Sequence, residues 1–269
     1  MPYAKPDNVI APMTKWGRRE ATVFSGFCSY HDKSLFQPIE DKEFAATEEQ
    51  IFLFIYRAFA REYHRKCEMV KFHQNLFSRK PSLVSLPKEE NLGYAMGLAL
   101  RDLDVDKEVF DKAIIEKDFS CLTYTVWEID STCKFAASGL EAPTFDIRLK
   151  HIQDLTKENQ PAKYIYYSVF PQEDKEICII AWLKHNDVFF ADYKKQLCSL
   201  DNDQRKNYIN NTLPIISENI VLNPTAWDAL PQYKQDEFNA LFAGIDVLAL
   251  LSGEPNSRLE PASYNLFSL

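Results

Sequence analysis

The chain has 269 residues, of which 46% are hydrophobic and 26% are charged, and its formal net charge at pH 7 is -8. Its 19 Phe, 13 Tyr and 4 Trp supply large apolar side chains for a core and exclude a mainly disordered protein. The acidic balance excludes a protein that coats nucleic acid or an anionic membrane by charge alone.

Residues 1–46 show no clear hydrophobic period and are interrupted by prolines and glycines, so we expect an irregular segment. Thr47 to Gln50 then has the pattern of a capping box, in which the Thr47 hydroxyl accepts from the Gln50 amide and the Gln50 side chain returns to the Thr47 amide. An apolar stripe at helical spacing follows and predicts a helix from about Glu48 into the mid-70s.

Residues 91–118 predict a second helical region. The acidic run DLDVD suggests a break near residues 102–106, with a new helix beginning there. Gly93 and Gly97 are small residues at a spacing that would let another helix approach closely.

From Phe119 the apolar period changes from helical to two, which is typical of half-buried strands. Strands are predicted at residues 122–129, 134–142, 145–149, 164–170 and 177–183, with the polar run 171–176 as a hairpin connection. Helices are predicted at residues 188–200, 203–218 with an interruption at Pro214, and 232–251.

This order predicts an α+β fold: an N-terminal irregular segment and long helices, a central antiparallel sheet of about four strands, and C-terminal helices. We expect one domain over residues 1–269, since no linker-like composition separates the parts 1–118 and 119–269 into which it could be divided.

The most apolar run, AGIDVLALL at residues 243–251, is shorter than the roughly 20 residues of a membrane-spanning helix. The N-terminus lacks a signal-peptide pattern, so we expect a cytoplasmic protein with no membrane partner. No cysteine belongs to a CxxC pair, and Cys121, Cys178 and Cys198 lie in apolar runs where we expect buried, reduced thiols.

Cys28 and His31 are separated by two residues, a spacing at which both side chains can reach one metal ion. His64 and Cys67 lie at i and i+3 on the predicted helix and share one face, so the four could form a zinc site. Alternatively, Cys28 packs inside while His31 and Asp32 hydrogen-bond a turn, or a partner subunit completes the site. The predicted cofactor is therefore zinc or none.

The run FCSYHDKSLFQPIE at residues 27–40 resembles a group of uncharacterised bacterial proteins with an F-C-x-x-H-D-x-x-L-F-x-P-I-E block. The resemblance covers about residues 15–66, including Glu62 and Lys66. In that group a CxxC motif and a Ser-His-Ser element often precede the block, which implies a zinc-binding front half that this chain does not contain. The resemblance also implies an association with mobile elements and defence genes, and it implies no particular activity.

Arg57, Arg61 and Arg65 recur every four residues on the predicted helix, where guanidinium groups could bind phosphate or carboxylate. Residues 1–80 carry a net charge of +3, whereas the rest of the chain carries -11. Nucleic acid is therefore a candidate partner only through this local basic helix. The plainer interpretation is a solvated helix face that is balanced by neighbouring glutamates.

Two functions fit these patterns, and the chain shows no P-loop, GxGxxG, GxSxG or HExxH motif. The first is a non-enzymatic interaction or sensing protein that binds another protein subunit, or a phosphate-bearing ligand, through the Cys-His-Asp turn and the arginine-lined helix. The alternative is a metal-dependent, nuclease-like hydrolase in which the metal-binding or acid/base groups are His31, Asp32, Glu40 and Glu62.

Overall fold

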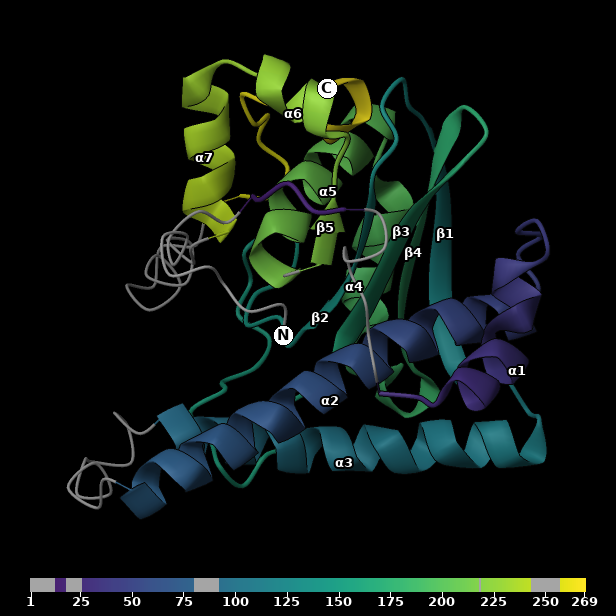
Figure 1. Cartoon of the computed structure of the whole chain (residues 1–269), viewed down its shortest axis with the longest axis vertical. Helices are drawn as coiled ribbons and strands as arrows, with labels where there is room; N and C mark the ends of the chain where they lie inside the picture. Colours follow the sequence, from purple (N-terminus) through teal and green to yellow (C-terminus); the bar gives the residue numbers. More distant parts are fainter. Residues whose placement is uncertain (1–12, 18–25, 80–91, 218, 243–256) are drawn as a thin grey trace.

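The computed structural model describes residues 13–17, 26–79, 92–217, 219–242 and 257–269. An antiparallel sheet in the order β1-β4-β3-β2-β5 lies at its centre (Figure 1). The strands are β1 (Leu122–Asp130), β2 (Ala136–Glu141), β3 (Ile165–Gln172), β4 (Lys175–Leu183) and β5 (Asn219–Val221). The predicted α+β class is confirmed, with five strands in place of about four.

Helices precede and follow the sheet strands in the chain. Those before β1 are α1 (Ser29–Glu40), α2 (Glu48–Arg79) and α3 (Leu92–Glu116). Those after β4 are η4 (Lys184–Asn186), α4 (Ala191–Ser199), α5 (Asn202–Ile216), α6 (Pro224–Ala229), α7 (Gln232–Phe242) and η5 (Leu266–Ser268). Within the described residues, no helix combines the length and apolar character that a bilayer crossing requires.

Neighbouring sheet residues alternate between two cores, because successive side chains of a strand point to opposite faces. Tyr166 and Ile179 belong to the first core, which packs against α1, α2 and α3. Tyr167 and Ile180 belong to the second core, which packs against α4, α5, α7 and the residues from 257 onward. Helices α1, α2 and α3 thus supply one cover of the sheet, and elements that follow β4 supply the other.

α1 lies within the segment that we expected to be irregular. Phe36 is fully buried on its inner face, and Leu35 and Ile39 pack against the first core beside it. Pro38 lies inside the last turn of the helix, so the prolines of this segment do not prevent a helix here. The apolar spacing therefore outweighs the proline, whose carbonyl oxygen instead accepts from the Gln50 side chain at 3.1 Å.

α2 begins at Glu48, as predicted, but only half of the predicted capping box forms. The Gln50 amide donates to the Thr47 hydroxyl at 3.2 Å. The Gln50 side chain accepts from the Ala45 amide at 2.7 Å and donates to the Glu43 carbonyl at 2.8 Å. Gln50 is buried and therefore ties the α1–α2 connection together instead of returning to Thr47.

α3 is continuous, so the predicted break near residues 102–106 is wrong. Asp102 and Asp106 are one helical turn apart and face the protein interior. Asp106 accepts from the Tyr166 hydroxyl, and Asp102 accepts from the Ala162 amide at 3.0 Å. The acidic run thus supplies partners for buried donors, which sequence periodicity alone does not reveal.

α5 is also continuous, although an interruption was expected at Pro214. Proline removes the amide that would bond the carbonyl four residues earlier, which belongs to Asn210. The Tyr264 hydroxyl donates to that carbonyl at 2.8 Å and replaces the missing bond. A residue 54 positions away in the sequence therefore allows the helix to continue.

Two other predictions differ from the structure. Residues 145–149 form no strand, and Phe145 makes only an isolated bridge with His151. Asn219, expected to end a helix, begins β5, which pairs with β2. α7 covers Gln232–Phe242 of the helix predicted at residues 232–251, and residues 243–251 lie outside the described residues.

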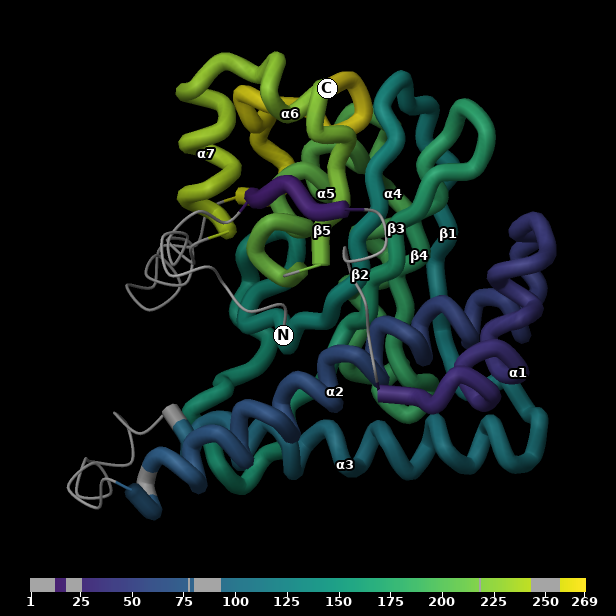
Figure 2. Tube along the Cα trace, viewed as in Figure 1, coloured from purple at the N-terminus to yellow at the C-terminus, as the bar shows by residue number. Residues whose placement is uncertain are grey.

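The first described segment, residues 13–17, lies beside elements of the C-terminal part of the chain (Figure 2). Met13 packs against the second core, and Lys15 forms an ion pair with Asp228 of α6 at 2.5 Å. The same core contains Tyr264, Leu266 and Phe267 from the C-terminal residues.

Candidate functional site

The Cys-His-Asp turn is the first turn of α1. Cys28 precedes the helix, and its carbonyl accepts from the Asp32 amide at 2.9 Å. The helical turn places Cys28 Sγ 3.1 Å from His31 Nδ1. Cys28 and His31 are exposed, so the alternative in which Cys28 packs inside is wrong. Tyr30 between them is 75% exposed, and its ring contacts the His31 ring edge-on.

This turn stands on packed aromatic rings. Phe27 contacts Phe36 with ring centroids 5.5 Å apart, and Phe36 stacks on Tyr56 of α2. The Arg57 guanidinium lies 4.2 Å from the centroid of the Phe36 ring and pairs with Glu40. Such a base holds the exposed residues of α1 in a fixed position relative to α2.

The structure does not gather the predicted zinc ligands Cys28, His31, His64 and Cys67. Among the described residues, no three His, Cys, Asp or Glu side chains lie in an arrangement that could hold a metal ion. Of these four residues, Cys28 and His31 contact each other. Burial raises the pKa of the Cys67 thiol, and this opposes the thiolate form that zinc requires.

The arginine stripe is matched by carboxylates of the same chain. Arg57 pairs with Glu40 at the end of α1. Arg61 and Arg65 pair with Glu62 at 3.3 Å and 2.9 Å, and Glu62 is only 3% exposed. The stripe therefore forms, but its guanidinium groups are held by internal carboxylates, which favours the solvated-face interpretation over a phosphate-binding surface.

The four residues of the hydrolase alternative also stay apart. His31 and Asp32 lie in the first turn of α1, whereas Glu40 ends that helix, roughly 12–14 Å further along its axis. Glu62 is buried between two arginines on α2. No catalytic arrangement follows from these positions, because acid/base groups must reach one substrate together.

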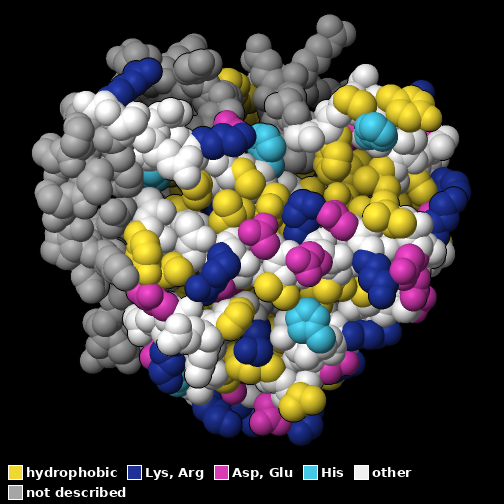
Figure 3. Space-filling model, turned by 90° about the horizontal axis from the view of Figure 1, so that it is seen from below, with side chains coloured by type: hydrophobic (Ala, Val, Ile, Leu, Met, Phe, Trp, Pro, Cys, Tyr) yellow, Lys and Arg dark blue, Asp and Glu magenta, His cyan; other side chains and the backbone are white. Residues whose placement is uncertain are grey.

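The surface beside α2 and α3 is mixed in charge. Figure 3 shows this side of the molecule, where Lys and Arg alternate with Asp and Glu. Hydrophobic side chains gather in the upper right of that view. A mixed surface of this kind gives no field of one sign that would attract a polyanion over a distance.

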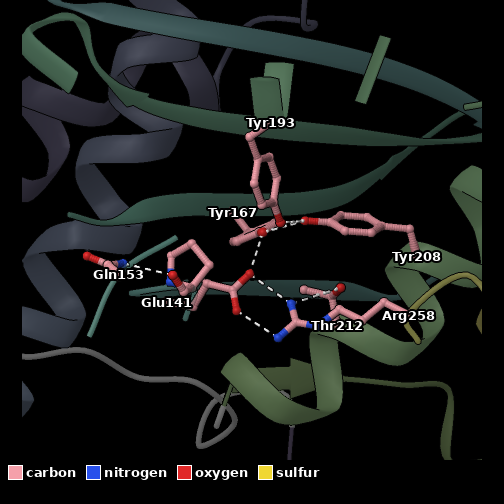
Figure 4. A network of polar contacts seen from close by, with 8 residues as sticks. Glu141, Gln153, Tyr167, Tyr193, Tyr208, Thr212 and Arg258 are labelled. Carbon is pink, nitrogen blue, oxygen red and sulfur yellow. Dashed lines mark hydrogen bonds and ion pairs between the residues drawn. The ribbon is translucent and has the colours of Figure 1, made fainter. Parts of the chain in front are cut away.

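The sequence did not reveal a network of polar side chains in the second core (Figure 4). Glu141 at the end of β2 and Arg258 form two parallel hydrogen bonds, both 2.8 Å long. The Tyr167 hydroxyl donates to Glu141 at 2.6 Å. The Tyr208 hydroxyl lies 2.6 Å from that of Tyr167 and 2.8 Å from that of Tyr193.

The electrostatics of this network favour a structural role. Burial raises the pKa of Tyr208 to about 12, and Glu141 adds to the shift. The pKa values of Tyr167 and Tyr193 are also raised by burial. All three hydroxyls therefore stay protonated at neutral pH and serve as hydrogen-bond donors. No local sequence signal could identify this group, because its members come from five separate segments.

Comparison of the chain with known proteins identifies no relative. No family model, no curated protein and no solved structure matches the chain.

Proposed function

We propose that this chain is a non-enzymatic interaction protein that binds another protein subunit through the first turn of α1. We call Cys28, Tyr30, His31 and Asp32 the α1 surface. The supporting observation is the exposure of Tyr30, 75%, beside a Cys-His contact on a packed aromatic base. Tyrosine is enriched among residues that dominate protein–protein binding, since it buries a large rigid surface and offers a hydroxyl.

A protein partner suits this surface better than a phosphate-bearing ligand. The three arginines of the neighbouring stripe already pair with Glu40 and Glu62. A phosphate would have to displace these carboxylates, whereas a protein partner could use the exposed tyrosine and histidine and leave the ion pairs intact.

The resemblance of residues 15–66 to bacterial proteins of mobile and defence-associated genes supports a role as a subunit of a defence complex. We place that complex in the cytoplasm, because all six cysteines are free thiols, as expected in a reducing compartment. A zinc site at Cys28 and His31 would then need ligands from the partner.

The test compares two tyrosine variants of the full chain. Tyr30→Ala removes the central side chain of the α1 surface, and Tyr233→Ala removes a similarly exposed tyrosine, 63%, on α7. Proteins captured from the source cells by the unaltered chain would be purified, and their dissociation constants measured by calorimetry with all three forms. We expect Tyr30→Ala to weaken binding at least about tenfold and Tyr233→Ala to leave it unchanged.

Each component of the proposal can fail separately. If no captured protein binds again as a purified component, the interaction function is wrong. If both variants bind equally well, the function stands but the α1 surface is not its site. Thermal melting should show both variants within about 0.5 kcal/mol of the unaltered chain, which separates lost binding from lost folding.

A further inference from the structure

β1 is an outer strand of the sheet, with β4 as its hydrogen-bonded neighbour (Figure 1). Its nine residues contain no proline or lysine, and its register with β4 is not interrupted by a bulge. Proline, lysine, bulges and short length are common means of keeping an edge strand from pairing with another chain. The charged residues of β1, Glu128 and Asp130, are confined to its C-terminal end.

The backbone bonds at the two ends of β1 show which residues form its open edge. The Lys184 amide donates to the Cys121 carbonyl at 2.9 Å, and the Ser131 amide donates to the Asp174 carbonyl at 3.0 Å. Antiparallel strands bond through every second pair of facing residues, so the odd-numbered residues of β1 bond to β4. The even-numbered residues therefore direct their N–H and C=O groups outward, where no backbone bond forms within the described chain.

This edge is accessible from residue 124 onward. Leu122 is only 4% exposed, whereas Tyr124 and Val126 are half-buried and Glu128 and Asp130 are exposed. The side chains of Tyr124 and Val126 pack against the first core. A strand added here could therefore bond to the backbone and place apolar side chains beside this core.

Arg205 of α5 supplies an unpaired positive charge on the second face of the same strand. Its guanidinium carbon lies 5.4 Å from the centroid of the Trp127 ring. Arg205 is half-buried, and its Nε is buried without a hydrogen-bond partner among the described residues. Glu128 lies on the opposite face, where it pairs with Lys175 at 2.9 Å. A carboxylate from another chain would give the Arg205 guanidinium a charge-assisted bond.

A second copy of this chain does not suit the edge. Antiparallel pairing of two β1 strands would join two sheets with their second faces on the same side. Arg205 of each copy would then lie on that side near the junction, where like charges repel. A different protein can bring a carboxylate to the same place.

We propose that the edge of β1 binds an extended segment of another protein in which apolar and acidic residues alternate. The main chain of this segment bonds to Tyr124, Val126 and Glu128 and adds a strand to the sheet. Its apolar side chains lie on the first face, and an acidic side chain on the second face pairs with Arg205. None of these residues belongs to the α1 surface, so this second binding surface is independent of the proposed function.

Two seven-residue peptides test the proposal with the full chain. In one, valine alternates with glutamate, and in the other, valine alternates with lysine. Fluorescence anisotropy should show the glutamate peptide binding at least about tenfold more tightly. The net charge of -8 would by itself favour the lysine peptide, so this result requires a local cation. Absence of binding by the glutamate peptide, or equal binding of both peptides, would overturn the proposal.

Amide hydrogen exchange, followed by NMR, locates the bound peptide. The glutamate peptide should slow exchange at Val126 and Glu128, whose amides point outward. Exchange at Thr125 and Trp127 should be slow with or without the peptide, because these amides already bond to β4. Slower exchange at another part of the chain, with none at Val126 and Glu128, would show that the edge is not the site.

Two variants test the charge. Arg205→Gln should weaken binding of the glutamate peptide about tenfold, whereas Lys206→Gln, an equal charge change at the next residue of α5, should not. Equal effects of the two variants would show that Arg205 does not contact the peptide. Melting of both variants checks that the fold is kept.

Sedimentation of the unaltered chain tests the other occupant. We expect a monomer at all protein concentrations. A dimer that Val126→Pro dissociates would show that the edge binds a second copy instead, because proline removes the outward amide and leaves the bonds to β4 in place.

Discussion

Both faces of the sheet bury packed aromatic rings, but the larger network of polar side chains from distant segments lies on the second face. Phe59 and Phe110 stack with centroids 4.6 Å apart, and Phe54 stacks on Phe170 at 4.0 Å. The second face contains the ion pair between Glu141 and Arg258, which are 117 residues apart. Ring packing tolerates small changes of geometry, whereas a buried polar network requires every partner.

The C-terminal residues are also held by hydrogen bonds to side chains that are distant in the sequence. Asn211 donates to the Arg258 carbonyl at 3.0 Å and to the Glu260 carbonyl at 2.8 Å. Asn210 accepts from the Leu266 amide at 2.9 Å. The second face is therefore held by specific long-range hydrogen bonds as well as by apolar burial, and variants on the two faces should differ in severity.

The largest difference in stability between the two faces is expected when a paired arginine on each face is replaced by methionine. Arg258→Met leaves the largely buried Glu141 without its cation and should lower the free energy of unfolding by about 3–5 kcal/mol. Arg57→Met breaks a pair whose side chains are 36% and 41% exposed, and should cost about 1 kcal/mol or less. Urea unfolding of both variants measures the difference.

Equal losses for the two variants would contradict the contrast between the faces. A double variant, Glu141→Gln with Arg258→Met, serves as the control. It removes the unpaired charge and should recover part of the loss.

The second effect concerns Glu176 of β4, which is fully buried and points toward the second face. One carboxylate oxygen accepts from the Phe135 amide at 3.1 Å, and the other has no partner within the described residues. Burial raises the pKa of Glu176 from 4.5 to about 7. Its contribution to stability is therefore complete below pH 4.5 and is lost as the pH rises through 7.

Glu176→Gln removes this titration. Relative to the unaltered chain, the variant should gain roughly 3 kcal/mol between pH 4.5 and about pH 8, as measured by urea unfolding at each pH. Asp106 on the first face, whose pKa burial raises to about 6, titrates in both proteins and cancels in the comparison. A constant difference across this pH range would show that Glu176 is ionised in the folded protein.

A smaller loss of stability is expected from a substitution at Gly139 of β2. A Cβ atom there would lie 2.7 Å from the Ile216 carbonyl oxygen and 3.2 Å from its carbon, both in the backbone. Gly139→Ala must therefore push α5 away from the sheet and should cost about 1–3 kcal/mol. Thermal melting would detect this loss, and an unchanged melting temperature would mean that α5 can shift freely.

The smallest predicted change in stability is a gain. Among the described residues, no atom lies within 4 Å of a Cβ added at Gly97 of α3, so Gly97 does not provide the close helix approach that its spacing suggested. Gly97→Ala should raise the free energy of unfolding by about 0.5–1 kcal/mol through helix propensity. A loss would show that this part of α3 is packed more closely than its contacts indicate.

Elements that depend on local apolar periodicity could be predicted from the sequence. α2, β1 and the hairpin of β3 and β4 match the expected ranges closely, because each buries a regular stripe or alternation. The missed features depend on distant partners: Tyr264 maintains α5 through Pro214, and Asp106 faces Tyr166 inside a continuous helix.

In the candidate site, too, local features could be predicted and tertiary contacts could not. The Cys28 and His31 contact is local and was predicted from their spacing, whereas the pairing of His64 and Cys67 with them required a tertiary contact that does not form. The polar network of the second core had no signal in the sequence, since Glu141 and Arg258 are 117 residues apart.

The bond between Tyr264 and Asn210 also sets an order of events during translation. The strands and helices of the first face are all complete once residue 183 has been synthesised, so that face can begin to form early. The second face must wait until Arg258 and Tyr264 leave the ribosome. Until then the Asn210 carbonyl lacks its Tyr264 donor and the Glu141 carboxylate lacks its cation.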